Sequence, residues 1–217
     1  MAKKLAICLD LDGTLVVSEV AHVKAFQEAF TKNGYPSKSE KEITAMFGIP
    51  AKQIVNKFFP KANPRDITKI INDKTHFFLT DTYRYIKRIP GVIEALNELK
   101  GKFKLAIITN STMEETKFIL EKLNIPQDFF DDIVTVEQVR NPKPYADEIK
   151  KVEKDLNTKV LYVVGDTIFD IQAGKAAGCK TIGVLSGHHS NGELYAVQPT
   201  HIIESVAELP DLVFGRI

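Results

Sequence analysis

The sequence predicts an α/β fold in which a doubly wound, mostly parallel sheet forms the core and an α-helical cap domain is inserted into it. The first observation is a series of short, continuous apolar runs, which are typical of parallel strands covered on both faces. The second is that polar residues follow these runs, at the edge of such a sheet where ligands bind. The third is a long segment with helical periodicity between the first run and the second.

The first strand is predicted at residues 5–9, and it leads directly into Asp10-Leu11-Asp12-Gly13-Thr14. Residues two apart in a strand project to the same side, so Asp10 and Asp12 can face one site. Asp-Gly is also a common turn signal, and a plain strand followed by a turn is the alternative interpretation.

The segment between Asp12 and the next strand is far longer than one helix requires. Apolar residues recur in it at steps of three and four, which predicts two amphipathic helices; they are Val20, Val23, Phe26 and Phe30, then Ile67, Ile70, Ile71, Phe78 and Tyr85. Breaks fall at 46–50 and 58–60, and Pro64 begins the last helix. We therefore predict a helical cap at residues 17–86, with residues 1–16 and 87–217 forming the core.

Polar clusters recur after three later strands, predicted at 105–108, 133–136 and 160–164. The first cluster, 109–111, opens a helix predicted at 113–123, and the last precedes a helix predicted at 168–177. Further strands are predicted near 181–185 and 201–203. The clusters contain Thr109, Asn110 and Ser111, then Lys143 between two prolines, then Asp166 and Asp170.

Each of these residues also has a simpler interpretation when it is taken alone. Thr109 could be the N-cap of the following helix. Lys143 could be a solvated loop lysine, one among 29 Lys and Arg. Asp170 could be a surface carboxylate, favoured near a helix start by the helix dipole.

Taken together, the four clusters resemble the motifs of the haloacid dehalogenase-like superfamily of phosphohydrolases, in the same order and over essentially the whole chain. The resemblance implies a Rossmann-like core and a cap that closes over the site and excludes water. It departs from the common pattern at Val17 and Ala146, neither of which carries chemistry. Asp12 argues against dehalogenases and phosphonatases, and Thr14 is more similar to phosphatases than to sugar phosphate mutases.

The resemblance assigns a role to each motif residue. Asp10 is implied to be the nucleophile that forms an aspartyl phosphate, and Asp12 the general acid and base, with its side chain off the metal. Asp10 and Asp166 supply the oxygen ligands that suit Mg²⁺, completed by the backbone carbonyl of Asp12.

The remaining motif residues are implied to handle the phosphoryl group. Thr109 and the amide of Asn110, expected at a helix start, bind its oxygens, and Lys143 neutralises it. Asp170 is expected to position Lys143 or a metal-bound water. In the cap, the segment 46–48 (Met46, Phe47, Gly48) is a candidate for substrate selection, with packing inside the cap as an equal alternative.

We therefore expect a Mg²⁺-dependent phosphatase that hydrolyses small phosphomonoesters through an aspartyl phosphate. The alternatives are a sugar phosphate mutase of the same superfamily and, from another class, a receiver-type signalling module, which also combines a phosphorylated Asp, Mg²⁺, a Thr and a Lys. Receiver modules are considerably shorter and place the phosphorylated Asp after a middle strand of the chain.

Composition agrees with an enzyme of one domain plus an insertion, because the chain has 217 residues and is 44% hydrophobic. The net charge of +1 gives no strong attraction to nucleic acid or anionic membranes. No apolar run is long enough for a membrane span, and Asp10 and Asp12 interrupt the N-terminal apolar stretch, so we expect a cytoplasmic location. The expected partner is a small phosphorylated metabolite, and the oligomeric state stays open.

The pair His188-His189 lies in a Gly, Ser and Asn-rich loop and is interpreted as a surface pair.

Overall fold

A six-stranded parallel sheet forms the core of the computed structural model, which describes residues 4–216. The strand order is β5-β4-β1-β6-β7-β8, so β1 lies inside the sheet between β4 and β6. The strands are β1 (Ala6–Leu9), β4 (Lys104–Thr109), β5 (Asp132–Thr135), β6 (Val160–Gly165), β7 (Lys180–Val184) and β8 (His201–Ile203). The predicted α/β fold class is confirmed.

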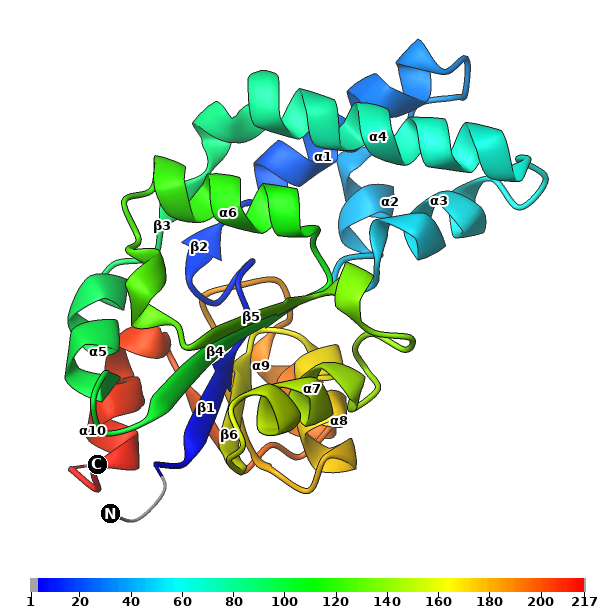
Figure 1. Cartoon of the computed structure of the whole chain (residues 1–217). Helices are drawn as coiled ribbons and strands as arrows, with labels where there is room; N and C mark the ends of the chain where they lie inside the picture. The colour runs from blue at the N-terminus through cyan, green and yellow to red at the C-terminus, as the bar shows by residue number, and fades with distance from the viewer. Residues whose placement is uncertain (1–3, 217) are drawn as a thin grey trace.

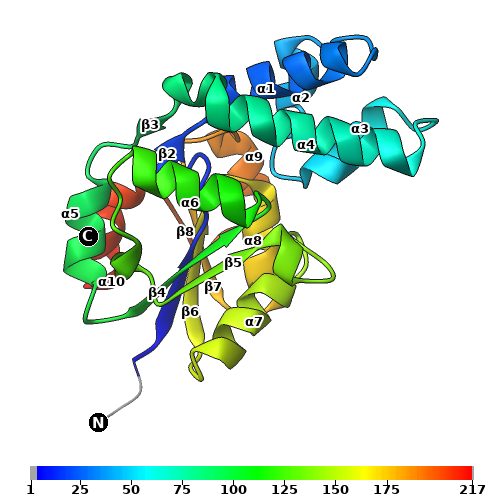
Figure 2. The same cartoon turned by 45° about the horizontal axis from the view of Figure 1, so that its top comes forward.

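Helices cover both faces of this sheet (Figure 1, Figure 2). The helices α5 (Val92–Leu99), α6 (Met113–Lys122) and α10 (Leu209–Val213) lie on one face, and α7 (Asp147–Asp155) and α8 (Ile168–Ala176) on the other. Strand β1 shows why both faces are covered: Ile7 and Leu9 belong to the first hydrophobic cluster, and Ala6 and Cys8 to the second. The remaining short elements are α9 (Asn191–Ala196) and the 3₁₀ turns η2 (Gln127–Phe129), η3 (Val136–Gln138) and η4 (Val206–Glu208).

Residues 17–86, which we call the insertion, leave the sheet after β1 and return before α5. The two connections pair with each other as an antiparallel ribbon, β2 (Val16–Val17) with β3 (Lys87–Arg88). The insertion contains α1 (Glu19–Lys32), α2 (Glu40–Thr44), α3 (Ala51–Phe58), α4 (Pro64–Thr80) and η1 (Thr82–Tyr85). It packs around its own apolar cluster and lies over the carboxyl ends of the strands (Figure 1).

Helix α4 begins at Pro64, as predicted, because the side chain of Asn63 accepts hydrogen bonds from the next two free backbone N–H groups. The strand predicted at 133–136 instead ends at Thr135, which caps η3 in a reciprocal contact with Gln138. Within residues 4–216 no helix has the length and apolar character needed to span a bilayer.

Candidate active site

The carboxyl ends of three neighbouring strands bring the predicted residues together. Asp10 follows β1, Thr109 ends β4 and Asp166 follows β6, and these strands are adjacent in the sheet. All three side chains are buried, and so are Lys143 and Asp170. Burial of five polar side chains at one edge requires that they satisfy one another or a ligand.

Lys143 is the centre of this polar group. Its ammonium nitrogen lies 2.5 Å from Asp10 Oδ1 and 2.7 Å from Asp170 Oδ1, and it donates a third hydrogen bond to the carbonyl of Ile108 at 3.1 Å. Burial lowers the pKa of Lys143, but the charges of Asp10 and Asp170 outweigh it and hold the pKa well above its usual value. The alternatives of a solvated lysine and a surface Asp170 are therefore wrong.

The carboxylates of Asp10, Asp166 and Asp170 offer oxygen atoms that lie within 4.8 Å of one another. Burial, reinforced by the charge of Asp170, raises the pKa of Asp166 to about 7. Burial also raises the pKa of Asp10, and Lys143 offsets this only in part. Three buried carboxylates facing one ammonium leave an excess of negative charge. A hard divalent cation such as Mg²⁺ fits this donor set, because it prefers carboxylate oxygen ligands.

Two glycines allow the chain to approach Asp166 closely. Gly13 has a φ of +83°, and a Cβ there would lie 2.3 Å from Asp166 Oδ2. A Cβ on Gly187 would lie 2.1 Å from the same oxygen. The carboxylate is fixed by the hydroxyl of Thr14 at 3.3 Å and by the backbone N–H of His188 at 2.7 Å. Any larger residue at either glycine would displace the carboxylate.

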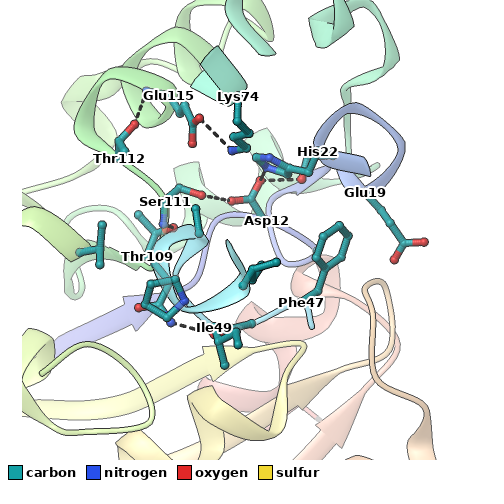
Figure 3. Close-up of a pocket in the computed structure, with 18 of the residues that line it drawn as sticks. Asp12, Glu19, His22, Phe47, Ile49, Lys74, Thr109, Ser111, Thr112 and Glu115 are labelled. Atoms are coloured by element: carbon teal, nitrogen blue, oxygen red, sulfur yellow. Dashed lines mark hydrogen bonds and ion pairs between the residues drawn. The ribbon is translucent and has the colours of Figure 1, made fainter. Parts of the chain in front are cut away.

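Asp12 does not belong to the acidic cluster, and neighbouring side chains hold its carboxylate (Figure 3). One carboxylate oxygen accepts a hydrogen bond from Ser18 Oγ at 2.5 Å and faces His22 Nε2 at 3.2 Å, and the other accepts from Ser111 Oγ at 2.7 Å. Burial raises the pKa of Asp12, but His22 and these hydrogen bonds outweigh it and place the pKa below its usual value. Asp12 is therefore a fixed carboxylate beside the cluster.

Thr109 and Asn110 differ from their predicted local settings. The N-cap of α6 is Thr112, whose hydroxyl accepts the backbone N–H of Glu115, while Thr109 Oγ1 accepts the N–H of Ser111. The N-cap interpretation of Thr109 is wrong, and Asn110 lies two residues before the cap. Asn110 instead reaches the insertion and donates from Nδ2 to the carbonyl of Gly48 at 2.7 Å.

Several residues of the site were not predicted from the sequence. Ser18, His22 and Ser111 position Asp12. The sequence signals for them were weak: Ser18, the residue before α1, is four positions from His22, and Ser111 belongs to the polar cluster after a predicted strand. His188 lines the cavity with its ring 3.2 Å from Glu19 and is half-buried, so it belongs to the site although the sequence indicated only a surface loop.

A cavity of about 880 Å³ lies between the insertion and the strand ends. The phosphoryl candidates Thr109 and Lys143 line it from the core, and Phe47 and Gly48 line it from the insertion. Met46 and Phe47 both pack against the insertion's own apolar cluster. The predicted selection segment therefore combines cavity lining, at Phe47 and Gly48, with packing inside the insertion, at Met46 and Phe47.

Known proteins are similar to this chain in sequence and in fold. A family model described as haloacid dehalogenase-like hydrolase matches residues 7–184. A pyrophosphatase PpaX from Halalkalibacterium halodurans is 30% identical over 219 residues, covering 95% of this chain and 95% of that protein. A phosphoglycolate phosphatase from Vibrio parahaemolyticus is 27% identical over 217 residues, with 95% of each covered. A solved hydrolase from Pseudomonas syringae shares the fold with a TM-score of 0.85 and 23% identity, covering 98% of this chain and 99% of that one.

Proposed function

The chain belongs to the haloacid dehalogenase-like hydrolase family, and we propose that it is a Mg²⁺-dependent phosphatase that hydrolyses small phosphomonoesters through an aspartyl phosphate on Asp10. The observation that carries this proposal is the buried cluster in which Lys143 joins Asp10 and Asp170 beside Asp166, with Asp12 held apart from it. This arrangement supports a nucleophilic role for Asp10 inside the cluster and a proton-transfer role for Asp12 outside it.

Asp10 and Asp166 would hold the metal ion, with the backbone carbonyl of Asp12 as a further ligand. The bound ion would neutralise the repulsion between a carboxylate and an anionic phosphoryl group. Asp170 would act through Lys143, since its Oδ1 accepts from the ammonium group and its Oδ2 accepts from the backbone N–H and hydroxyl of Thr167.

In the first half of the reaction, an oxygen of Asp10 attacks phosphorus and the bond from phosphorus to the alcohol oxygen breaks. Lys143 holds the other oxygen of Asp10 and, with the Thr109 hydroxyl, balances the phosphoryl charge. Asp12 must carry a proton when the substrate is bound, and it passes this proton to the oxygen of the departing alcohol, which leaves Asp12 as a carboxylate.

In the second half, water attacks the phosphorus atom and the bond to Asp10 breaks, which releases phosphate and restores the carboxylate. Asp12 takes the proton from this water. The hydrogen bonds from Ser18 and Ser111 favour the carboxylate form of Asp12, which is the form that this step requires. Asp12 thus acts as the general acid in the first half of the reaction and as the general base in the second.

The two relatives compared above are named as a pyrophosphatase and a phosphoglycolate phosphatase. These names favour a phosphatase over the alternative of a sugar phosphate mutase. Their names also support small phosphorylated compounds as the substrate class. We further propose that the insertion, residues 17–86, is the cap domain that shields the reaction from water. The antiparallel ribbon of β2 and β3 would be its hinge, because both connections to the core run through it.

Hydrolysis of an aryl phosphate tests the proposal. We expect turnover with Mg²⁺, loss of turnover in excess chelator, and recovery when Mg²⁺ is restored. Asp10→Asn should be inactive because an amide is a far poorer nucleophile. Asp128→Asn, an exchange of the same kind at a side chain that is 76% exposed, should be fully active. Full activity of wild type in chelator, or of Asp10→Asn with Mg²⁺, would remove the proposal.

A further inference from the structure

The cavity is larger than a phosphoryl group requires, and the space beyond it must receive the alcohol part of the substrate. Its volume of about 880 Å³ is in the range of sites that bind drug-sized molecules. The insertion faces this space with a set of apolar side chains, which we call the alcohol wall. The wall consists of Phe47, Ile49, Ile54 and Ile71. Such a wall favours a leaving group with an apolar face.

Two of the three lysines that line the cavity are already paired. Lys143 is bound to two aspartates, as described above. Lys74 lies 2.8 Å from Glu115, with side chains only 4% and 2% exposed, and Thr75 donates to the same carboxylate oxygen. Of the lysines and arginines that line the cavity in residues 4–216, Lys52 alone has no ion-pair partner, and it is exposed to solvent.

The cavity also carries carboxylates beyond the acidic cluster and the Lys74 pair. Glu19, Glu114 and Glu137 line it, so the lining holds three further carboxylates and one lysine, Lys52, without an ion-pair partner. The imidazole ring of His188 does not reverse this balance, because it is already 3.2 Å from Glu19. The part of the cavity that would receive the alcohol is therefore lined by the apolar alcohol wall and by more carboxylates than unpaired cations.

We infer that this phosphatase selects phosphomonoesters whose alcohol is uncharged and has an apolar face, and disfavours alcohols that carry a carboxylate or a second phosphate. A second anion entering this space would lose hydration without gaining a buried, unpaired cation, and it would approach three carboxylates. Phe47 offers the apolar contact: its ring makes edge contacts with those of His22 and His188, with centroid distances of 6.3 and 5.7 Å. This inference rests on the proposed function and narrows its substrate class.

A matched pair of aryl phosphates tests the selection. The neutral member is 4-(2-hydroxyethyl)phenyl phosphate and the anionic member is 4-(carboxymethyl)phenyl phosphate, which have similar size and similar leaving oxygens. We expect kcat/KM with Mg²⁺ to be higher for the neutral member by about tenfold or more, from charge repulsion at short range. Equal values, or a preference for the anionic member, would overturn the inference while leaving the phosphatase proposal intact. Absence of turnover with both members would remove the phosphatase proposal, and this inference with it.

A charge placed on the alcohol wall should change this ratio. Ile49→Lys adds a cation that faces the cavity, and we expect the preference for the neutral member to fall by about threefold or more. Gln53→Lys is the matched control, because Gln53 is an exposed residue of α3 outside the cavity lining and the variant gains the same charge. The ratio of two substrates does not depend on the fraction of active protein. An unchanged ratio in Ile49→Lys, or an equal change in both variants, would contradict the role of the wall.

Discussion

Glu148 is a buried acid that takes no part in the proposed reaction, and its replacement gives a sharp test of the electrostatics. It lies in the first turn of α7 with 0% of its surface exposed, and neither carboxylate oxygen has a hydrogen-bond partner within residues 4–216. Burial raises its pKa to about 7, in spite of the opposing charge of Lys143. Glu148→Gln keeps the shape and removes the ability to ionise.

The sign and size of the effect follow from linkage. Because the pKa of Glu148 rises from 4.5 to about 7 on folding, the folded state binds more protons between these pH values. The free energy of unfolding of the wild type therefore falls as the pH rises through this window. At about 1.4 kcal/mol for each unit of pKa, the total loss is about 3 kcal/mol. Glutamine does not ionise, so the variant avoids this loss.

Urea unfolding at pH 5 and at pH 8.5 measures the effect. We expect the stability of Glu148→Gln relative to wild type to increase by about 2.5 kcal/mol between the two pH values, because part of the loss already occurs below pH 5. Glu121→Gln, an exchange of the same kind at an exposed position of α6, should show no such change. If the difference between Glu148→Gln and wild type is the same at both pH values, Glu148 ionises normally and the reasoning is refuted.

Three further predictions concern the site and the insertion. Asp166→Asn removes one charged ligand, so the Mg²⁺ concentration that gives half-maximal turnover should rise by about tenfold or more. An unchanged Mg²⁺ titration would contradict the assignment of Asp166 as a metal ligand. Gly13→Ala should lose activity but keep its circular dichroism spectrum, because the new Cβ would lie 2.3 Å from the Asp166 carboxylate, and normal kcat would contradict the close approach. Lys74→Met leaves Glu115 buried without its partner and should lower the free energy of unfolding by about 3 kcal/mol in urea titrations, whereas a loss within experimental error would show that the pair is not formed in solution.

The sequence predicted the parts of the site that follow directly from strands. Asp10, Thr109 and Asp166 each stand at the end of an apolar run, so the parallel sheet alone brings them to one edge. Lys143 could be included because its loop follows such a strand. The strand predicted at 133–136 ends one residue earlier in the structure, because Thr135 caps the 3₁₀ turn η3 and the strand does not continue past it.

The remaining contacts could not be predicted, because they depend on how elements distant in the chain pack together. Ser111 reaches Asp12 across 99 positions, and this contact exists only because β4 is adjacent to β1. The Lys74 pair with Glu115 joins the insertion to α6, and periodicity does not indicate which charged residue of α4 turns inward. Glu148 opens a charged helix and therefore resembles a solvated residue in sequence, yet it is fully buried.

The most direct test of the central claim is the intact mass of Asp12→Asn after it is mixed with Mg²⁺ and an aryl phosphate that has a good leaving group. Such a donor needs no general acid, so the aspartyl phosphate should still form. Attack by water should slow by about 10²- to 10⁴-fold without the base, so the intermediate should accumulate. We predict one added phosphoryl group that peptide mapping places on Asp10, while wild type releases phosphate without accumulating it. A wild-type protein that keeps a long-lived phosphoryl group without sustained phosphate release would contradict turnover and indicate a receiver-like role.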